Sequence, residues 1–304
     1  MELKNNNFIS KEHGSTLIEI LITMAITGIV SAAIFTSFQS QQKSYVVQEN
    51  VAAMQQNLRA GRSMMVREIR MAGYDRQSIG GLGILNIRPK DINNNIDLTM
   101  SGNGAIQISA DFDDDGVLGG GETISFSIAD SPISSPDGNP DLTRNNGGGR
   151  QALAENIQAL GFAYAFDADD DGILDTYSVF ENPQVIWAID SDGDNDIDIN
   201  LDTNGDGDID AADGPGIGNS GLIGGQSLVD FGGTAISDVA VDDIRAVRIW
   251  ILARADQRDN KYLNTHTYVV GHKVITPNTD GDPDNDNLRM RLLTTTVKCR
   301  NLGL

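Results

Sequence analysis

Residues 15–38 most constrain what this chain can fold into, because all but one of these 24 residues are uncharged and most are apolar; the one charge is Glu19. As an α-helix the segment would be about 36 Å long at roughly 1.5 Å per residue, enough to cross the hydrocarbon core of a bilayer. A carboxylate inside a membrane span is costly, so an acid at such a position indicates a function. The sequence therefore predicts a transmembrane helix that carries a functional carboxylate.

The residues before this span decide how it is processed. A cleavable secretory signal has a basic start, a short apolar core and small residues after that core. Here the small residue, Gly14, precedes the apolar segment, and the polar leader carries Lys4 and Lys11. A cut after Gly14 would leave the apolar helix on the mature protein. An uncleaved N-terminal anchor is the alternative, and it would need neither the glycine nor the acid.

The sequence GSTLIEILITMAITGIV, which starts at Gly14, resembles the signal of type IV prepilins and type II secretion pseudopilins. The resemblance implies that a prepilin peptidase cuts between Gly14 and Ser15 and methylates the new amine, so that Glu19 becomes the fifth mature residue. In that family the acid pairs with the N-terminal amine of a neighbouring subunit. The positive charge of that amine compensates the carboxylate in a medium of low dielectric. Ser15 replaces the usual phenylalanine and Thr36 stands where major pilins usually have proline, and both departures point to a minor pilin.

The helix is expected to continue beyond the membrane. Apolar side chains recur there at helical spacing and form a stripe: Val47, Val51, Met54, Leu58, Met65 and Ile69. Gly73 is a plausible stop signal. We therefore predict one helix from about Thr16 to Ala72.

After Tyr74 the sequence predicts short strands and loops. Residues 105–110, 122–129, 162–167 and 176–180 alternate as strands do, and the best candidates are residues 244–255, 267–274 and 290–301. These last three are expected to form an antiparallel sheet under the helix, with Trp187 and Trp250 in the core or at its edge. The predicted fold class is α+β and pilin-like: a leader at 1–14, a transmembrane helix at 15–38, an amphipathic helix at 39–73 and a β-rich head at 74–304.

The order of these parts resembles the PilW family of minor pilins. The matching pieces are the prepilin start and the sequences REIRMAGY, ENIQALGFAYAFD, VRIWILAR and RLLTTTVKCRNL. The resemblance implies a structural subunit that primes or caps a type IV pilus and binds major and minor pilins through its N-terminal helix. It also implies a single-pass protein of the inner membrane, with the head outside the cytoplasm, that later enters the extracellular filament. Type II secretion minor pseudopilins of the J type share this layout and remain the alternative.

The charge of the chain is strongly negative and unevenly placed. The formal net charge is −21, and residues 151–244 contain 21 acids and no Lys or Arg. This balance argues against nucleic acid as a partner, because phosphate binding needs clustered Lys and Arg. The single cysteine, Cys299, excludes an intramolecular disulfide, so another device must stabilise the loops of an extracytoplasmic head.

Two acidic loops, 111–122 and 202–213, have the spacing of an EF-hand calcium loop, in which alternate side chains surround a hard cation and a glycine allows the sharp turn. A third loop, 167–175, matches at positions one, three, five, six and nine but lacks an acid at position twelve. The 202–213 loop offers Asp202, Asn204, Asp206, Asp208, Asp210 and Asp213; the 111–122 loop offers Asp111, Asp113, Asp115 and Glu122; and the 167–175 loop offers Asp167, Asp169, Asp171 and Asp175. Residues 190–198 and 280–286 fit the pattern less well. The alternative is ordinary turn chemistry, since Asp, Gly and Asn favour turns for their own reasons. We expect structural Ca²⁺ in the first three loops.

Two functions follow from these features, and they are compatible with each other. One is a minor pilin that primes filament assembly, and the other is a calcium-dependent, adhesin-like head carried on a pilin stalk. The sequence offers no nucleophile–base pair, phosphate loop or zinc spacing, so we do not expect an enzyme.

Overall fold

The computed structural model describes residues 16–88, 104–130, 138–177, 184–213, 226–228, 236, 238–278 and 286–303. The contacts divide the chain into two compact units, Met1–Glu49 and Asn50–Leu304, and each is described by itself. The first helix, α1 (Leu17–Met71), runs through the boundary between them.

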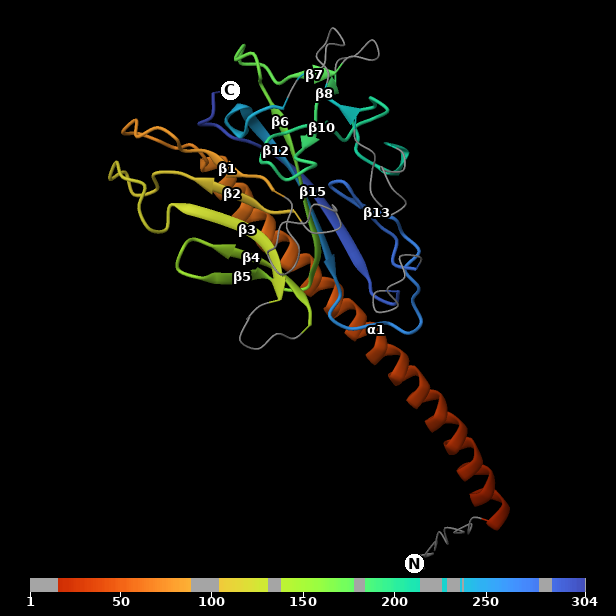
Figure 1. Cartoon of the computed structure of the whole chain (residues 1–304). Helices are drawn as coiled ribbons and strands as arrows, with labels where there is room; N and C mark the ends of the chain where they lie inside the picture. Colours follow the sequence, from red (N-terminus) through yellow and green to blue (C-terminus); the bar gives the residue numbers. More distant parts are fainter. Residues whose placement is uncertain are drawn as a thin grey trace, which may run out of the picture. The chain divides into compact units, whose positions relative to one another are not determined.

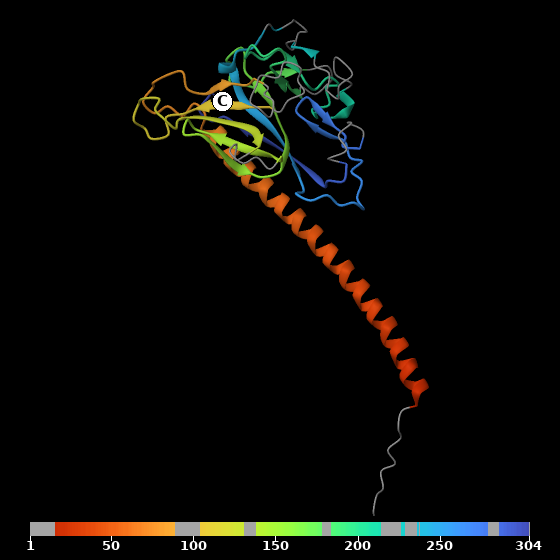
Figure 2. The ribbon, with the colours of Figure 1, turned by 60° about the horizontal axis from the view of Figure 1, so that its bottom comes forward.

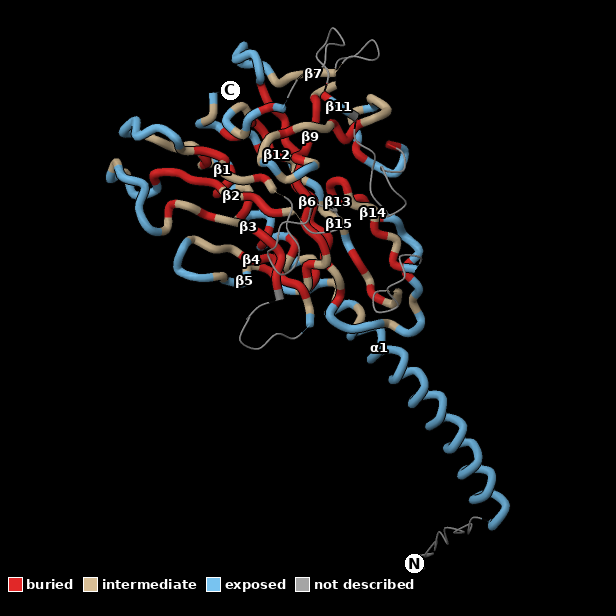
Figure 3. Tube along the Cα trace, viewed as in Figure 1, coloured by how far each residue is buried: buried red, intermediate tan, exposed pale blue. Residues whose placement is uncertain are grey.

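The first unit contains the N-terminal part of α1. The carbonyl of Thr16 accepts hydrogen bonds from the amides of Glu19 and Ile20, and Glu19 lies in the first turn of the helix. An acid is favourable there because the amide end of a helix carries a partial positive charge. The described residues up to Val46 are all exposed (Figure 3), and α1 is long and apolar enough to cross a membrane.

The second unit contains two antiparallel sheets, which lie to either side of the C-terminal end of α1 (Figures 1 and 2). One sheet has the order β1-β2-β3-β4-β5, formed by Ile84–Asn86, Ile106–Ser109, Thr123–Asp130, Pro140–Asn145 and Arg150–Ala154. The other has the order β11-β10-β9-β6-β12-β15, formed by Gln226–Ser227, Ile199–Asn200, Ala188–Ile189, Ile157–Phe166, Ile244–Arg254 and Met290–Lys298. The described part of the unit also contains two small two-stranded sheets, β7 (Thr176–Tyr177) with β8 (Gln184–Val185) and β13 (Tyr268–Val270) with β14 (Lys273–Ile275), and the short helices η1 (Ala211–Asp213) and η2 (Val241–Asp243).

One face of α1 joins the two sheets. Met54, Leu58, Met65 and Ile69 of the predicted apolar stripe are buried in a single core cluster that includes residues of both sheets. The helix packs closely on the five-stranded sheet at Gly61, where an added Cβ would lie 2.7 Å from the side chain of Leu142.

Polar contacts fix α1 on both sides. Glu68 accepts a hydrogen bond of 2.9 Å from Nε of Arg144 on β4, and its side chain is 7% exposed. Arg62 donates from Nε to Oγ1 of Thr295 on β15 at 3.4 Å. The helix ends at Met71 because Gly73, as predicted, takes a left-handed conformation with φ +75°.

The opposite face of the six-stranded sheet has its own apolar cluster. Trp187 and Trp250 are buried there with Leu201, Ile209 and Tyr268, so both tryptophans lie in the core as expected. The guanidinium of Arg248 lies 4.3 Å from the centroid of the Trp187 ring, a favourable cation–π contact.

One expectation about the strands was wrong, and one sheet was not predicted. Residues 267–274 do not form one strand beside 244–255: they fold into the β13–β14 hairpin, which turns at Gly271 with φ +62° and belongs to neither large sheet. The hairpin backbone passes so close to β6 that a Cβ at Gly161 would lie 2.6 Å from the amide nitrogen of Gly271. The second, five-stranded sheet was also not expected, because β4 and β5 do not alternate clearly in sequence. Of the predicted strand 176–180, Thr176–Tyr177 is a strand and the remainder lies outside the described residues.

Candidate metal centres

Four acidic loops lie at the ends of strands, and they share one internal arrangement. The 111–122 loop connects β2 to β3, the 167–175 loop follows β6, the 190–198 loop connects β9 to β10, and the 202–213 loop follows β10. Each begins with an aspartate that is at most 3% exposed, because the strand before it carries the residue into the protein.

The first aspartate of each loop holds the turn together. One of its carboxylate oxygens accepts a hydrogen bond from the backbone amide five residues further on. The four bonds are Gly116 to Asp111 at 3.1 Å, Gly172 to Asp167 at 2.9 Å, Asn195 to Asp190 at 2.9 Å and Gly207 to Asp202 at 2.8 Å.

The third and fifth residues repeat the same device over shorter distances. Each accepts a hydrogen bond from the backbone amide two residues further on, as in Asp171 to Asp169 at 3.3 Å and Ile173 to Asp171 at 2.8 Å. These turns bring the carboxylate oxygens of positions one, three and five within 4.8 Å of one another in three loops: Asp111, Asp113 and Asp115; Asp167, Asp169 and Asp171; and Asp190, Asp192 and Asp194. In the 202–213 loop the third position is Asn204, whose Oδ1 accepts from the amide of Asp206 at 2.9 Å.

A final acid closes each loop. Its carboxylate accepts a hydrogen bond of 2.8 Å from the backbone amide of the second loop residue in all four cases. The closing acids are Glu122, Asp175, Asp198 and Asp213. The closing acid is the twelfth residue in the 111–122 and 202–213 loops and the ninth in the other two.

The fourth and sixth residues of every loop have positive φ angles. The pairs are Asp114 and Gly116, Asp170 and Gly172, Gly193 and Asn195, and Gly205 and Gly207. Glycine adopts this conformation without strain, and Asn and Asp tolerate it better than other residues. This requirement explains why the loops contain little besides Asp, Asn and Gly at these positions.

Burial and mutual repulsion make the metal-free loops electrostatically unfavourable. Burial raises the pKa values of Asp175, Asp190 and Asp202, and the neighbouring carboxylates raise them further by a smaller amount. Glu122 differs, because hydrogen bonds led by the one from the Gly119 amide lower its pKa. A cation among the carboxylates would reverse the unfavourable contribution.

Asp111 has one buried carboxylate oxygen that no hydrogen bond within the described part of the chain satisfies. The residue is 0% exposed and its Oδ2 accepts the Gly116 amide, but its Oδ1 is buried and accepts no hydrogen bond from the described residues. A buried polar oxygen without a hydrogen-bond partner is costly in the interior. Oxygen-only donor sets of this kind fit the preferences of Ca²⁺.

The 190–198 loop was underestimated from the sequence. Its glycine stands at the fourth position rather than the sixth, and Asn195 takes the sixth position with φ +83°. The signal that could have found it was the acid at position nine, which the 167–175 loop shares. The Asn195 side chain also accepts from the Ile87 amide at 3.0 Å and donates to the Leu85 carbonyl at 3.2 Å, which ties this loop to β1 and the segment after it.

The remaining predicted site residues have mixed outcomes. Gly14, Ser15 and most of 280–286 lie outside the described residues. Asp210 accepts from the amide of Ala212 at 2.6 Å, and Asp208 is exposed at the seventh position, where an EF-hand loop uses a backbone carbonyl.

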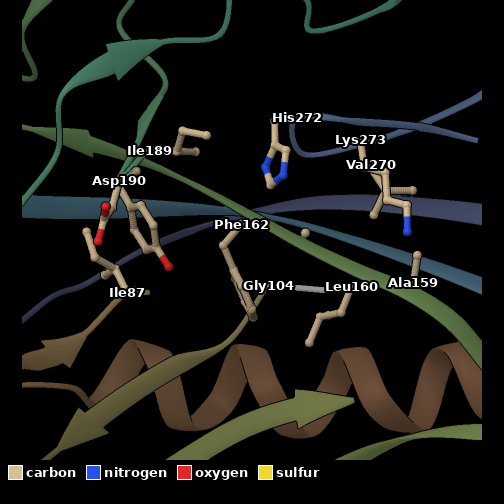
Figure 4. A pocket seen from close by; sticks show the side chains of 12 residues that line it. Ile87, Gly104, Ala159, Leu160, Phe162, Ile189, Asp190, Val270, His272 and Lys273 are labelled. Carbon is tan, nitrogen blue, oxygen red and sulfur yellow. The ribbon is translucent and has the colours of Figure 1, made fainter. Parts of the chain in front are cut away.

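A small cavity lies beside the first residue of the 190–198 loop (Figure 4). It is lined by Asp190, Tyr164 and His272 among others and has a volume of about 20 Å³. The Tyr164 hydroxyl is buried and has no hydrogen-bond partner among the described residues. A cavity of this size has room for a single water molecule.

Comparisons with known proteins match both ends of the chain. Residues 9–35 match the family model described as the prokaryotic N-terminal methylation motif, and residues 230–301, which contain β12 to β15, match the model described as Type IV Pilus-assembly protein W. A solved structure of a type IV-like pilin from Thermus thermophilus is similar at 12% identity with a TM-score of 0.35, and the alignment covers 81% of this chain and 97% of that chain. A comparison with curated proteins found no match. The two family models thus confirm the resemblance to a type IV minor pilin of the PilW type.

Proposed function

We propose that this protein is a structural subunit of a type IV pilus, inserted in the inner membrane by α1 and then assembled with other pilins through that helix. The observation that carries the proposal is the methylation motif at residues 9–35, directly at the start of a long apolar helix whose N-terminal residues are exposed. The match to the pilus-assembly family favours a pilus over a type II secretion pseudopilus.

Processing by a prepilin peptidase gives this proposal its test. Mass spectrometry of the protein from its native host should show loss of the first 14 residues and a methylated Ser15. Glu19→Ala should leave the head folded but reduce incorporation into filaments, because the carboxylate no longer neutralises a neighbouring amine. An intact Met1, or normal filaments with the Glu19→Ala variant, would contradict the proposal.

We also propose that Ca²⁺ stabilises the acidic loops and that the protein has no catalytic role. The common carboxylate arrangement and the unpartnered Oδ1 of Asp111 support the calcium proposal. Extracellular calcium modules bind in the range of roughly 0.1 to 1 mM, so a structural role fits better than signalling.

Direct counting of bound ions tests the calcium proposal. Equilibrium dialysis of a head fragment, residues 41–304, against millimolar Ca²⁺ should show at least three bound ions per chain. No binding above that of a protein of equal net charge would mean that the loops are ordinary turns.

A further inference from the structure

One flank of α1 carries an arginine stripe, which we define as Arg59, Arg62 and Arg70, with the half-buried Val66 between them. These residues are three or four positions apart, so they lie on one side of the helix. All three arginines are exposed, and the stripe contains no acid although the chain has a net charge of −21.

The arginines of the stripe lack a neutralising partner within the described part of the chain. None of them forms an ion pair there, and the hydrogen bond from Arg62 goes to the neutral hydroxyl of Thr295. Neighbouring basic groups behave differently: Arg144 pairs with Glu68, and Arg67 lies 3.7 Å from the same carboxylate. The stripe is therefore a local positive patch that folding leaves uncompensated.

The six-stranded sheet separates this patch from a negative one. Val247, Ile249 and Ile251 of β12 face the cluster that contains α1, whereas Trp250 and Leu252 face the opposite cluster. That opposite cluster includes Ile209 of the 202–213 loop and has Leu174 of the 167–175 loop packed against it.

We define these two loops, 167–175 and 202–213, as the acidic face. They contain ten aspartates and no basic residue, and one of the ten, Asp170, pairs with Arg245 of β12 at 3.1 Å. Two bound Ca²⁺ ions would offset only four of these charges, so the face remains negative in either state.

We propose that the arginine stripe of one copy binds the acidic face of a second copy, head to tail. Because the two surfaces lie on opposite sides of one sheet, the contact is heterologous and leaves a free stripe and a free acidic face at the two ends of every pair. Such contacts repeat along a filament instead of closing into a symmetric dimer. The inference goes beyond the calcium proposal and does not require filled calcium sites.

The head fragment is suitable for the test, because every buried residue that the structure describes lies between Met54 and Cys299. Sedimentation velocity of the fragment at about 50 mM NaCl should show a mean mass that rises with concentration, and about 500 mM NaCl should abolish this, since salt screens exposed charges. The double variant Arg59→Glu/Arg62→Glu should stay monomeric. The control Arg150→Glu/Lys261→Glu, which has the same net charge, should still associate.

Two results would overturn the inference. One is a wild-type fragment that stays monomeric at low salt. The other is equal association of the two double variants when both have the melting temperature of the wild type. A photo-crosslinking residue in place of Ser63, which is exposed beside the stripe, tests the partner in the full chain in its host. We expect cross-links to residues 167–213 of a second copy. Cross-links only to lipid or to a different protein would contradict that partner.

Repeating sedimentation in chelator separates the two proposals. If the fragment associates in chelator and dialysis shows that it binds no calcium, the calcium proposal alone is refuted. A fragment that binds calcium but never associates would refute this inference alone.

Discussion

Asp111, Asp167, Asp190 and Asp202 perform the same task in four places. Each is a buried carboxylate at the end of a strand, and each binds the backbone amide five residues further on. The repetition matters because the loops follow different strands, so a shared fold position cannot explain it. A common chemical requirement can explain the repetition, and the binding of a cation by oxygen ligands is such a requirement.

The pH dependence of the metal-free head follows from these residues. Burial raises the pKa values of Asp175, Asp190, Asp198 and Asp202, so each binds a proton more readily in the folded chain than in the unfolded one. A carboxyl with a raised folded pKa contributes stability that is present at low pH and lost as the pH rises through that value. Glu122, with its lowered pKa, acts oppositely, but only when the pH falls towards about 4, the ordinary carboxyl range.

We therefore predict that the melting temperature of the metal-free head fragment rises as the pH is lowered from neutral towards the raised pKa values of these carboxyls. In saturating Ca²⁺ the trend should reverse, because protons compete with the ion for the same carboxylates. Differential scanning calorimetry at several pH values measures both. A metal-free melting temperature that falls steadily over this range would show that the charged loop carboxylates do not destabilise the folded head.

At the scale of elements, α1 is the part that joins the two sheets. Its apolar stripe lies in a core shared by both, and Glu68 and Arg144 form a mostly buried ion pair between the helix and β4. Breaking such a pair on one side leaves an uncompensated charge in the interior, which costs about 3 kcal/mol or more.

Glu68→Ala should accordingly lower the melting temperature of the head fragment by about 6 to 12 °C, at roughly 2 to 4 °C per kcal/mol. Glu49→Ala, on the same helix but exposed, should change it by about 2 °C or less. The double variant Glu68→Met/Arg144→Met should recover part of the loss, since it removes both charges. Equal melting of the two single variants would mean that the pair does not stabilise this junction.

The elements also show how far the sequence alone could predict this protein. The helix was predicted within a residue at each end, because its apolar stripe and Gly73 are local signals. The strands β12 and β15 were found for the same reason. The β13–β14 hairpin was missed because its turn depends on a close approach to Gly161, about a hundred residues earlier in the chain. Such contacts have no local signature.

For the loops, too, the sequence predicted local features and missed those that depend on distant contacts. Spacing predicted which aspartates of the 111–122 and 167–175 loops lie together. It undervalued the 190–198 loop because Asn195 replaces the expected glycine, and it could not show that the side chain of Asn195 would bond to the backbone around β1. The unpartnered Oδ1 of Asp111 was also beyond the reach of the sequence, since it depends on burial.

On the scale of the whole molecule, the protein combines a long apolar helix with a head that has long acidic loops and no disulfide. Its only cysteine, Cys299, is buried, and burial raises the pKa of its thiol to about 12, so the thiol is unreactive. The loops lose conformational entropy on folding and bury little apolar surface in return. Bound ions are the device that our account assigns to this task.

Thermal unfolding of the head fragment in millimolar Ca²⁺ and in chelator tests the account most directly. One site contributes about 1.4 kcal/mol at a tenfold excess of ion over its dissociation constant, so two or three sites should raise the melting temperature by several degrees. Mg²⁺ should do less, because it demands tighter octahedral geometry. Asp206→Ala should remove part of the gain, and Asp242→Ala, an exposed acid outside the loops, should leave it unchanged. Identical melting curves in calcium and in chelator would contradict the account and reduce the loops to solvated turns.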